Sequence, residues 1–228
     1  MTSPDYTLHY APDNASLIIR LALEELRVPY RTQLVDRRTG AQKGPAHRRR
    51  HPGGLIPALD TPQGAIFETG AILLWLADRH GHLAPPPDNP ARGETLKWLF
   101  YLSNTVHPAL RMLFYPQNFV PIDAAPAWAA NTQKMLLSQL DILEHHWQPR
   151  DRPNLLDLYL APVLRWLRLY PTHDDHSWFD LAAYPRLHHM AHQLETRAST
   201  HAAQTAEGLG PTPFTAPRLP RPPEGSAL

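Results

Sequence analysis

The sequence predicts an α/β domain followed by a domain built of helices alone. Three observations lead to this fold class. Segments with the alternation and residue types of strands occur before residue 81. A stretch rich in proline and glycine, residues 81–90, then breaks every regular pattern. Beyond it only the spacing of amphipathic helices recurs.

The first domain reads as a βαβ unit followed by a ββα unit. Residues 6–10 and 30–35 are expected to be strands on either side of a helix over residues 17–26. Such a unit favours a right-handed crossover between parallel strands. Two short strands, 56–59 and 65–67, flank a turn, and a helix follows over 68–79. We therefore assign residues 1–81 to this domain and 82–90 to a linker.

Helical spacing predicts the second domain over residues 91–207. Helices are expected at 91–114, 124–147 and 154–169, with one or two more in 180–198. Asn154 and Asp157 stand three residues apart at the start of the third helix, which is typical of a capping box. Residues 208–228 are rich in proline and are expected to form an extended tail.

Composition excludes several classes of function. A formal net charge of +1 gives no reason to expect nucleic acid or an anionic membrane as the main partner. The chain has no cysteine, which excludes disulfides, cysteine-based zinc sites and a cysteine nucleophile. The N-terminus lacks the pattern of a secretory signal, and no apolar run approaches the length of about 20 residues that spans a bilayer. A soluble, cytoplasmic protein is expected.

The order βαβ, ββα, proline-rich linker and helical domain resembles that of cytosolic glutathione transferases. Residues 8–17, 21–25 and 153–160 are similar to bacterial beta-class members, although Ala15 stands where those members have a cysteine. The resemblance spans residues 6–210. It implies a thioredoxin-like first domain that binds glutathione, an all-α second domain that supplies an apolar pocket, and a homodimer.

The resemblance implies four main contacts to glutathione. By this resemblance, the peptide bond between Ile56 and Pro57 is expected to be cis, and the Ile56 backbone is expected to face the cysteinyl part of glutathione. Glu68 is expected to pair with the γ-glutamyl ammonium, and Thr69 with its carboxylate at a helix N-terminus. The alternative is that no ligand binds here. Pro57 is then an edge-strand proline, and Glu68 and Thr69 only provide a favourable start for the helix.

A basic contact to the glycyl carboxylate is less well defined by the sequence. His51 is one candidate, and Lys43 or the arginines at 48–50 are others. A solvated basic loop explains them equally well, since the family's loop lysine falls at Gly40.

The group that stabilises the thiolate must be a hydrogen-bond donor near the first helix. With Ala15 in the cysteine position, mixed-disulfide chemistry of that type is excluded, and the candidates are Ser16, Asn14 and Tyr10, in that order. Lowering a thiol pKa by two units requires about 2.7 kcal/mol, which one hydrogen bond to a charged group, about 1.5–3 kcal/mol, can supply. Ser16 or Asn14 as helix caps, and Tyr10 as a core residue, are the alternatives. Asp13 is expected to point toward backbone N–H groups.

The electrophile pocket is expected to face the first long helix of the second domain. His107 matches a beta-class histidine, and other residues at helical spacing near it are candidate walls: Tyr101, Asn104, Arg111 and Tyr115. A mixed packing face is the alternative. His188 and His192 lie at i and i+4 but lack a third ligand, so no metal site is predicted.

These residues favour a detoxification enzyme that uses a stabilised glutathione thiolate to conjugate or otherwise transform a small hydrophobic electrophile. Peroxide reduction, dehalogenation and isomerisation are variants of the same chemistry. The alternative, suggested by the missing cysteine and loop lysine, is a non-catalytic binding or interaction protein.

Overall fold

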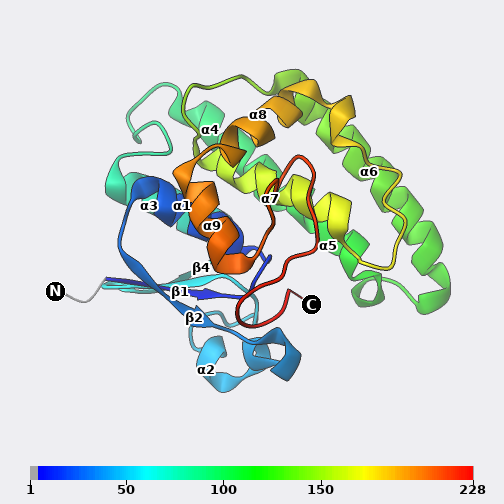
Figure 1. Ribbon diagram of the computed structural model, residues 1–228, viewed down its shortest axis with the longest axis horizontal. Coiled ribbons are helices and arrows are strands. Elements are labelled where there is room, and N and C mark those ends of the chain that lie inside the picture. Colours follow the sequence, from blue (N-terminus) through cyan, green and yellow to red (C-terminus); the bar gives the residue numbers. More distant parts are fainter. Residues whose placement is uncertain (1–4, 228) are drawn as a thin grey trace.

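The computed structural model describes residues 5–227 and confirms the predicted fold class (Figure 1). A four-stranded sheet lies beneath two helices of the first domain, and the helices of the second domain lie on the far side of those two. The bounds of the first-domain elements are β1 Tyr6–Tyr10, α1 Ser16–Leu26, β2 Tyr30–Leu34, α2 Pro45–Arg48, β3 Ala58–Thr61, β4 Gly64–Phe67 and α3 Thr69–His80. Those of the second are α4 Arg92–Tyr101, α5 His107–Phe114, α6 Ala125–His146, α7 Leu155–Leu169, α8 Pro185–Glu195 and α9 Ala198–Glu207.

The sheet has the order β2-β1-β3-β4. Strand β1 runs parallel to β2 and antiparallel to β3, which pairs with the antiparallel β4. The parallel β1–α1–β2 connection is the predicted crossover, and the β3–β4 hairpin follows it. The ladder of β3 begins at Ala58, two residues after the predicted start, because Ile56 and Pro57 pair with no neighbouring strand.

Helices α1 and α7 form the centre of the molecule. Every residue of α1 from Ser16 to Leu23 is buried, since the helix packs on the sheet, on α3 and on α7 and α9. A helix enclosed on all sides must be apolar all round, which explains its run of leucine, isoleucine and alanine. Helix α7 is buried in the same way over Leu155–Leu167.

The predicted capping box at the start of α7 is confirmed. Asn154 Oδ1 accepts from the N–H of Leu156 at 2.8 Å, and Asp157 Oδ2 accepts from the N–H of Asn154 at 2.8 Å. The pair satisfies backbone donors that a buried helix end would otherwise leave without acceptors.

The predicted single helix over residues 91–114 is wrong in one respect. A π-helical segment, Leu102–Val106, separates α4 from α5. Pro108 has no N–H to donate to the carbonyl four residues earlier, and its ring would collide with that carbonyl. The wider π turn accommodates both effects, and Pro108 is the sequence signal for it.

Two further predictions need correction. Helix α9 extends to Glu207, beyond the predicted limit of residue 198, and ends where Gly208 adopts φ 64°. Over residues 209–227 the tail after it has neither helix nor strand, but it folds back on the molecule and buries Phe214. In the described part of the chain, no helix is both long and apolar enough to cross a membrane.

Candidate functional site at one edge of the sheet

Four chain segments meet at one edge of the sheet because of the strand register. Tyr10 pairs with Leu34, so β1 and β2 end together. His9 pairs with Ala58, and Ala58 with Phe67, so β3 begins and β4 ends at the same level. The order along this edge is therefore the loop after β2, the loop after β1, the Ile56–Pro57 turn, and the start of α3.

The predicted glutathione-binding residues occupy the β3–β4 half of this edge. The Ile56–Pro57 peptide bond is cis. Glu68 is exposed and has φ 70°, a left-handed conformation that is uncommon outside glycine. No side chain caps α3, so N–H groups of its first turn are available for a carboxylate next to the buried Thr69. An ammonium and a carboxylate on one ligand match this arrangement of charges.

The predicted basic contacts lie in different environments. His51 is buried between His47 and Phe67, with ring centroids 6.4 and 4.7 Å away. Burial lowers the pKa of His51, and Glu68 opposes this effect, so the ring is a neutral hydrogen-bonding group at pH 7. Lys43 is exposed on the loop before α2, whereas Arg50 is paired with Asp60 at 2.9 Å.

The structure separates the three candidate thiolate donors. The Ser16 hydroxyl is fully buried; it donates to the Ala11 carbonyl at 3.0 Å and accepts from the Ala11 N–H, so it closes the loop between β1 and α1. The Tyr10 hydroxyl donates to the Glu224 carboxylate. Asn14 is half-buried, and its Oδ1 accepts from the N–H of Ala15 at 2.9 Å. Within residues 5–227 no acceptor binds the Asn14 amide nitrogen, which makes Asn14 the donor best placed for a ligand.

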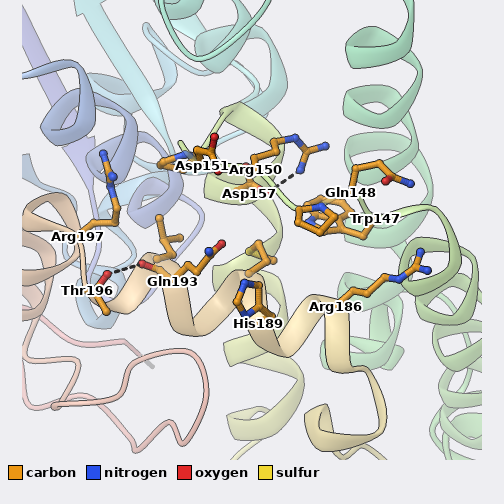
Figure 2. A pocket seen from close by; sticks show the side chains of 14 residues that line it. Trp147, Gln148, Arg150, Asp151, Asp157, Arg186, His189, Gln193, Thr196 and Arg197 are labelled. Carbon is orange, nitrogen blue, oxygen red and sulfur yellow. Dashed lines mark hydrogen bonds and ion pairs between the residues drawn. The ribbon is translucent and has the colours of Figure 1, made fainter.

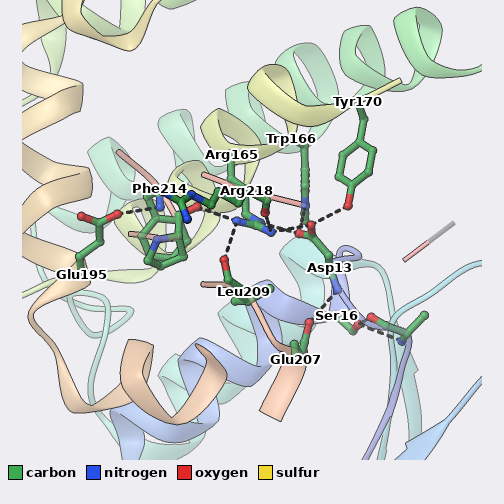
Figure 3. Close-up of polar contacts among 12 residues, drawn as sticks. Asp13, Ser16, Arg165, Trp166, Tyr170, Glu195, Glu207, Leu209, Phe214 and Arg218 are labelled. Carbon is green, nitrogen blue, oxygen red and sulfur yellow. Dashed lines mark hydrogen bonds and ion pairs between the residues drawn. The ribbon is translucent and has the colours of Figure 1, made fainter. Parts of the chain in front are cut away.

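Asp13 does not point toward backbone N–H groups, as the sequence led us to expect. Its carboxylate is fully buried and accepts from Arg165 Nε at 2.8 Å and from a terminal guanidinium nitrogen at 2.9 Å (Figure 3). Trp166 Nε1 and the Tyr170 hydroxyl donate to it at 2.8 and 2.7 Å. These contacts tie the loop before α1 to α7 and hold Asp13 at φ 49°.

A second buried ion pair supports the same loop. The N–H of Asp13 donates to Glu207 Oε2 at 2.8 Å, and Arg20 Nε donates to Glu207 Oε1 at 2.7 Å. Sequence reasoning missed both pairs. An arginine in the middle of the apolar run of α7, Arg165, was the available signal, because such a charge requires a buried partner.

His107, predicted to face the electrophile pocket, is the first residue of α5. His107 Nδ1 lies 2.9 Å from the Tyr159 hydroxyl, and the ring is tilted against Trp166. Burial, helped by the nearby Arg111 guanidinium, lowers the pKa of His107 to about 4. Burial raises the pKa of Tyr159, and the Glu68 carboxylate adds to this effect. His107 is therefore neutral at pH 7.

The other residues predicted to line the electrophile pocket lie in different environments. Arg111 is exposed, and its charge makes the smallest contribution to the lowered pKa of His51. Tyr115 is held by Arg37 at 3.1 Å. Asn104 is exposed and accepts from Ser103. Tyr101 instead packs against Trp98, which contacts His146 of α6, and the structure does not bring Tyr101 to this site.

Comparison with known proteins decides the family. A model described as the N-terminal domain of glutathione S-transferase matches residues 15–79, and one described as its C-terminal domain matches residues 126–189. Glutathione S-transferase GstA of Escherichia coli O157:H7 is 30% identical over 164 residues, covering 70% of this chain and 81% of that protein. The chain belongs to the glutathione S-transferase family.

Two further proteins are similar to this family member over most of its length. The disulfide-bond oxidoreductase YfcG of Escherichia coli K12 is 29% identical, over 89% of this chain and 96% of that protein. A crystal structure of a glutathione transferase homologue from Sulfitobacter, solved with bound glutathione, is 26% identical with a TM-score of 0.76, over 89% and 98% of the chains.

A cavity of about 160 Å³ lies elsewhere in this family member, between the α6–α7 loop and α8 (Figure 2). Trp147, Arg150, His189 and Arg197 are among its lining residues. Arg150 is paired with Asp157 at 3.0 Å, and Arg197 with Glu25. Arg186, a third arginine of the lining, donates to the backbone carbonyls of Glu144 and His145 at 3.4 and 2.7 Å. Among residues 5–227, no three or more histidine or carboxylate side chains are grouped to hold a metal ion.

Proposed function

We propose that this protein binds glutathione at the shared edge of the sheet and uses its thiolate to attack a small hydrophobic electrophile. The observation that carries the proposal is the convergence of three elements. The Ile56–Pro57 turn, the uncapped start of α3 beside Glu68, and the free amide of Asn14 all lie on that edge. The relative from Sulfitobacter, solved with bound glutathione, supports the choice of ligand.

Asn14 is the proposed thiolate donor. A hydrogen bond to a charged sulfur contributes about 1.5–3 kcal/mol, and lowering the thiol pKa by one to two units requires about 1.4–2.7 kcal/mol. One amide donor, assisted by the N-terminus of α1, therefore suffices. His107 is neutral, so it is suited to hydrogen-bond a co-substrate rather than to carry charge.

The deciding experiment is an ultraviolet titration of the thiolate of glutathione bound to the pure protein. We expect binding and a thiol pKa at least about one unit below the free value of about 8.5. Asn14→Ala should raise that pKa toward the free value. A normal pKa with intact binding would favour the non-catalytic alternative, and no binding would refute the proposal.

A second reaction is supported by the relative YfcG, a disulfide-bond oxidoreductase. A glutathione thiolate held by an amide donor can attack a disulfide as well as a carbon electrophile, since both steps require only an ionised sulfur. Parallel assays with a chloronitrobenzene and with a low-molecular-weight disulfide distinguish the two reactions.

Assembly and location complete the proposal. We propose a homodimer through the edge strand β4 and helix α4, where Phe67 and Phe100 are 39% and 55% exposed. Sedimentation analysis of Phe100→Asp tests this, since a monomer is expected.

We further propose a cytoplasmic location, because glutathione is kept reduced there; cell fractionation is the test. Membership of the beta class also remains a proposal.

A further inference from the structure

The C-terminal segment, residues 209–227, is fixed to the helical domain by two charged side chains. We call this segment the strap. Arg165 of α7 donates to the strap carbonyls of Leu209, Pro213 and Arg218 at 3.3, 3.0 and 2.9 Å (Figure 3). Glu195 of α8 accepts from the N–H groups of Phe214 and Thr215, each at 2.8 Å. A proline-rich chain has few N–H groups, so an arginine that binds its carbonyls is a suitable anchor.

The last residues of the strap reach the edge of the sheet. Tyr10 donates its hydroxyl to Glu224, and Arg37 donates to the Ala227 carbonyl at 2.6 Å. The same guanidinium donates to the Tyr115 hydroxyl at 3.1 Å. Residues 224–227, the strap tip, therefore lie between the ends of β1 and β2 and the end of α5.

Gly225 shows how closely the strap tip packs. A Cβ atom added there would lie 2.7 Å from a Leu34 methyl carbon and 3.3 Å from Pro12 Cδ. Its φ of +70° also favours glycine. The tip is thus seated against the loop that carries Asn14, two residues beyond Pro12.

The order of segments along the edge places the strap tip next to the proposed glutathione site. The proposed glutathione site takes the β1, β3 and β4 positions, whereas the tip takes the β2 and β1 positions. The β1–α1 loop, where the thiolate would lie, is common to both. An electrophile attacked by that thiolate must approach this loop, against which the tip is packed.

We propose that the strap tip is the outer wall of the electrophile pocket, and that Arg37 is the residue that sets how large an electrophile reaches the thiolate. This inference rests on the proposed function. The hydrogen bonds of Tyr10 and Arg37, the packing of Gly225 and the buried Ala227 hold the tip, whereas buried charges and the buried Phe214 hold the first half of the strap. Opening the tip breaks none of the bonds made by Arg165 and Glu195, so the rest of the strap can stay in place.

The test compares two benzylic chlorides that share a leaving group and differ in size, 4-nitrobenzyl chloride and 9-(chloromethyl)anthracene; their intrinsic reactivities cancel when the ratio of a variant is divided by that of the unaltered protein. Arg37→Ala removes the hydrogen bonds to Ala227 and Tyr115. Losing hydrogen bonds of about 0.5–1.5 kcal/mol shifts an open–closed equilibrium by about twofold to twelvefold. We expect the ratio of kcat/KM for the large over the small substrate to rise by about fivefold, as estimated from that shift.

Arg38→Ala is the matched control, because Arg38 is exposed and pairs with Asp36 at 3.4 Å. It removes the same charge one residue away and should leave the size ratio unchanged. Glu224→Gln, at an exposed residue, weakens the second contact of the tip and should raise the ratio even if Arg37→Ala folds poorly. If glutathione still binds and the size ratio is unchanged in both tip variants, the strap tip is not a wall of the electrophile pocket. Loss of glutathione binding in the unaltered protein would refute the proposed function first, and this inference with it.

Discussion

Replacing Asp13 by asparagine should destabilise the protein more than any surface change. The carboxylate is fully buried and accepts two hydrogen bonds from Arg165, one from Trp166 and one from Tyr170. An amide would turn its NH2 group toward these donors and leave the Arg165 charge without a counter-ion. Breaking a buried ion pair in this way costs about 3–5 kcal/mol. For a chain of this length that corresponds to a fall in Tm of about 6–20 °C.

Thermal unfolding followed by circular dichroism, with urea titration at 25 °C, measures this loss. Asp88→Asn is the control, since Asp88 is exposed in the linker and its substitution should change the unfolding free energy by less than about 0.5 kcal/mol. A loss below about 1 kcal/mol in Asp13→Asn would contradict the buried charge pair. The double variant Asp13→Leu with Arg165→Met removes both charges and should be less destabilised than the sum of the single changes.

Three further changes test the site. Glu68→Ala should weaken glutathione binding by about tenfold in calorimetry, equivalent to about 1.4 kcal/mol, with Tm retained; equal affinity would remove the γ-glutamyl contact. Asn14→Ala should raise the pKa of bound glutathione, whereas Ser16→Ala should lower Tm and leave that pKa in place; the reverse pattern would restore Ser16 as donor. His107, whose pKa is lowered from 6.5 to about 4, stays neutral in the folded state while the unfolded state protonates, so stability should fall as pH falls from 6.5 toward 4. Urea titrations across that range should show less of this loss in His107→Gln, and no such relief in His173→Gln, whose side chain is exposed.

Much of the fold follows from the sequence because its signals are local. The strand alternation, the hairpin turn and the capping box at Asn154 each concern neighbours along the chain, and each appears in the structure. The π segment was missed because Pro108 was read only as part of a helix. A proline in a helix interior removes one hydrogen bond, but whether the chain breaks, kinks or widens is decided by packing against other helices.

The thiolate donor illustrates what local signals do not provide. Ser16 and Asn14 are two residues apart, and both residue types favour helix starts. Their different roles depend on which side of the loop each faces, and that is set by Asp13. Its partners, Arg165 and Glu207, are 152 and 194 residues away along the chain. No periodicity in the sequence connects positions at such separations.

Arg165 binds both the loop that carries Asn14 and the first half of the strap. The strap tip can therefore move while that loop stays in place. The Arg165 guanidinium binds Asp13 on one side and the strap carbonyls up to Arg218 on the other. Lifting residues 224–227 breaks none of these bonds, so the Asn14 amide stays where Asp13 holds it. In the proposed reaction, a large electrophile displaces the strap tip without disturbing Asn14, the proposed thiolate donor. The pKa of bound glutathione should accordingly be equal in Arg37→Ala and in the unaltered protein, even though the two accept electrophiles of different size.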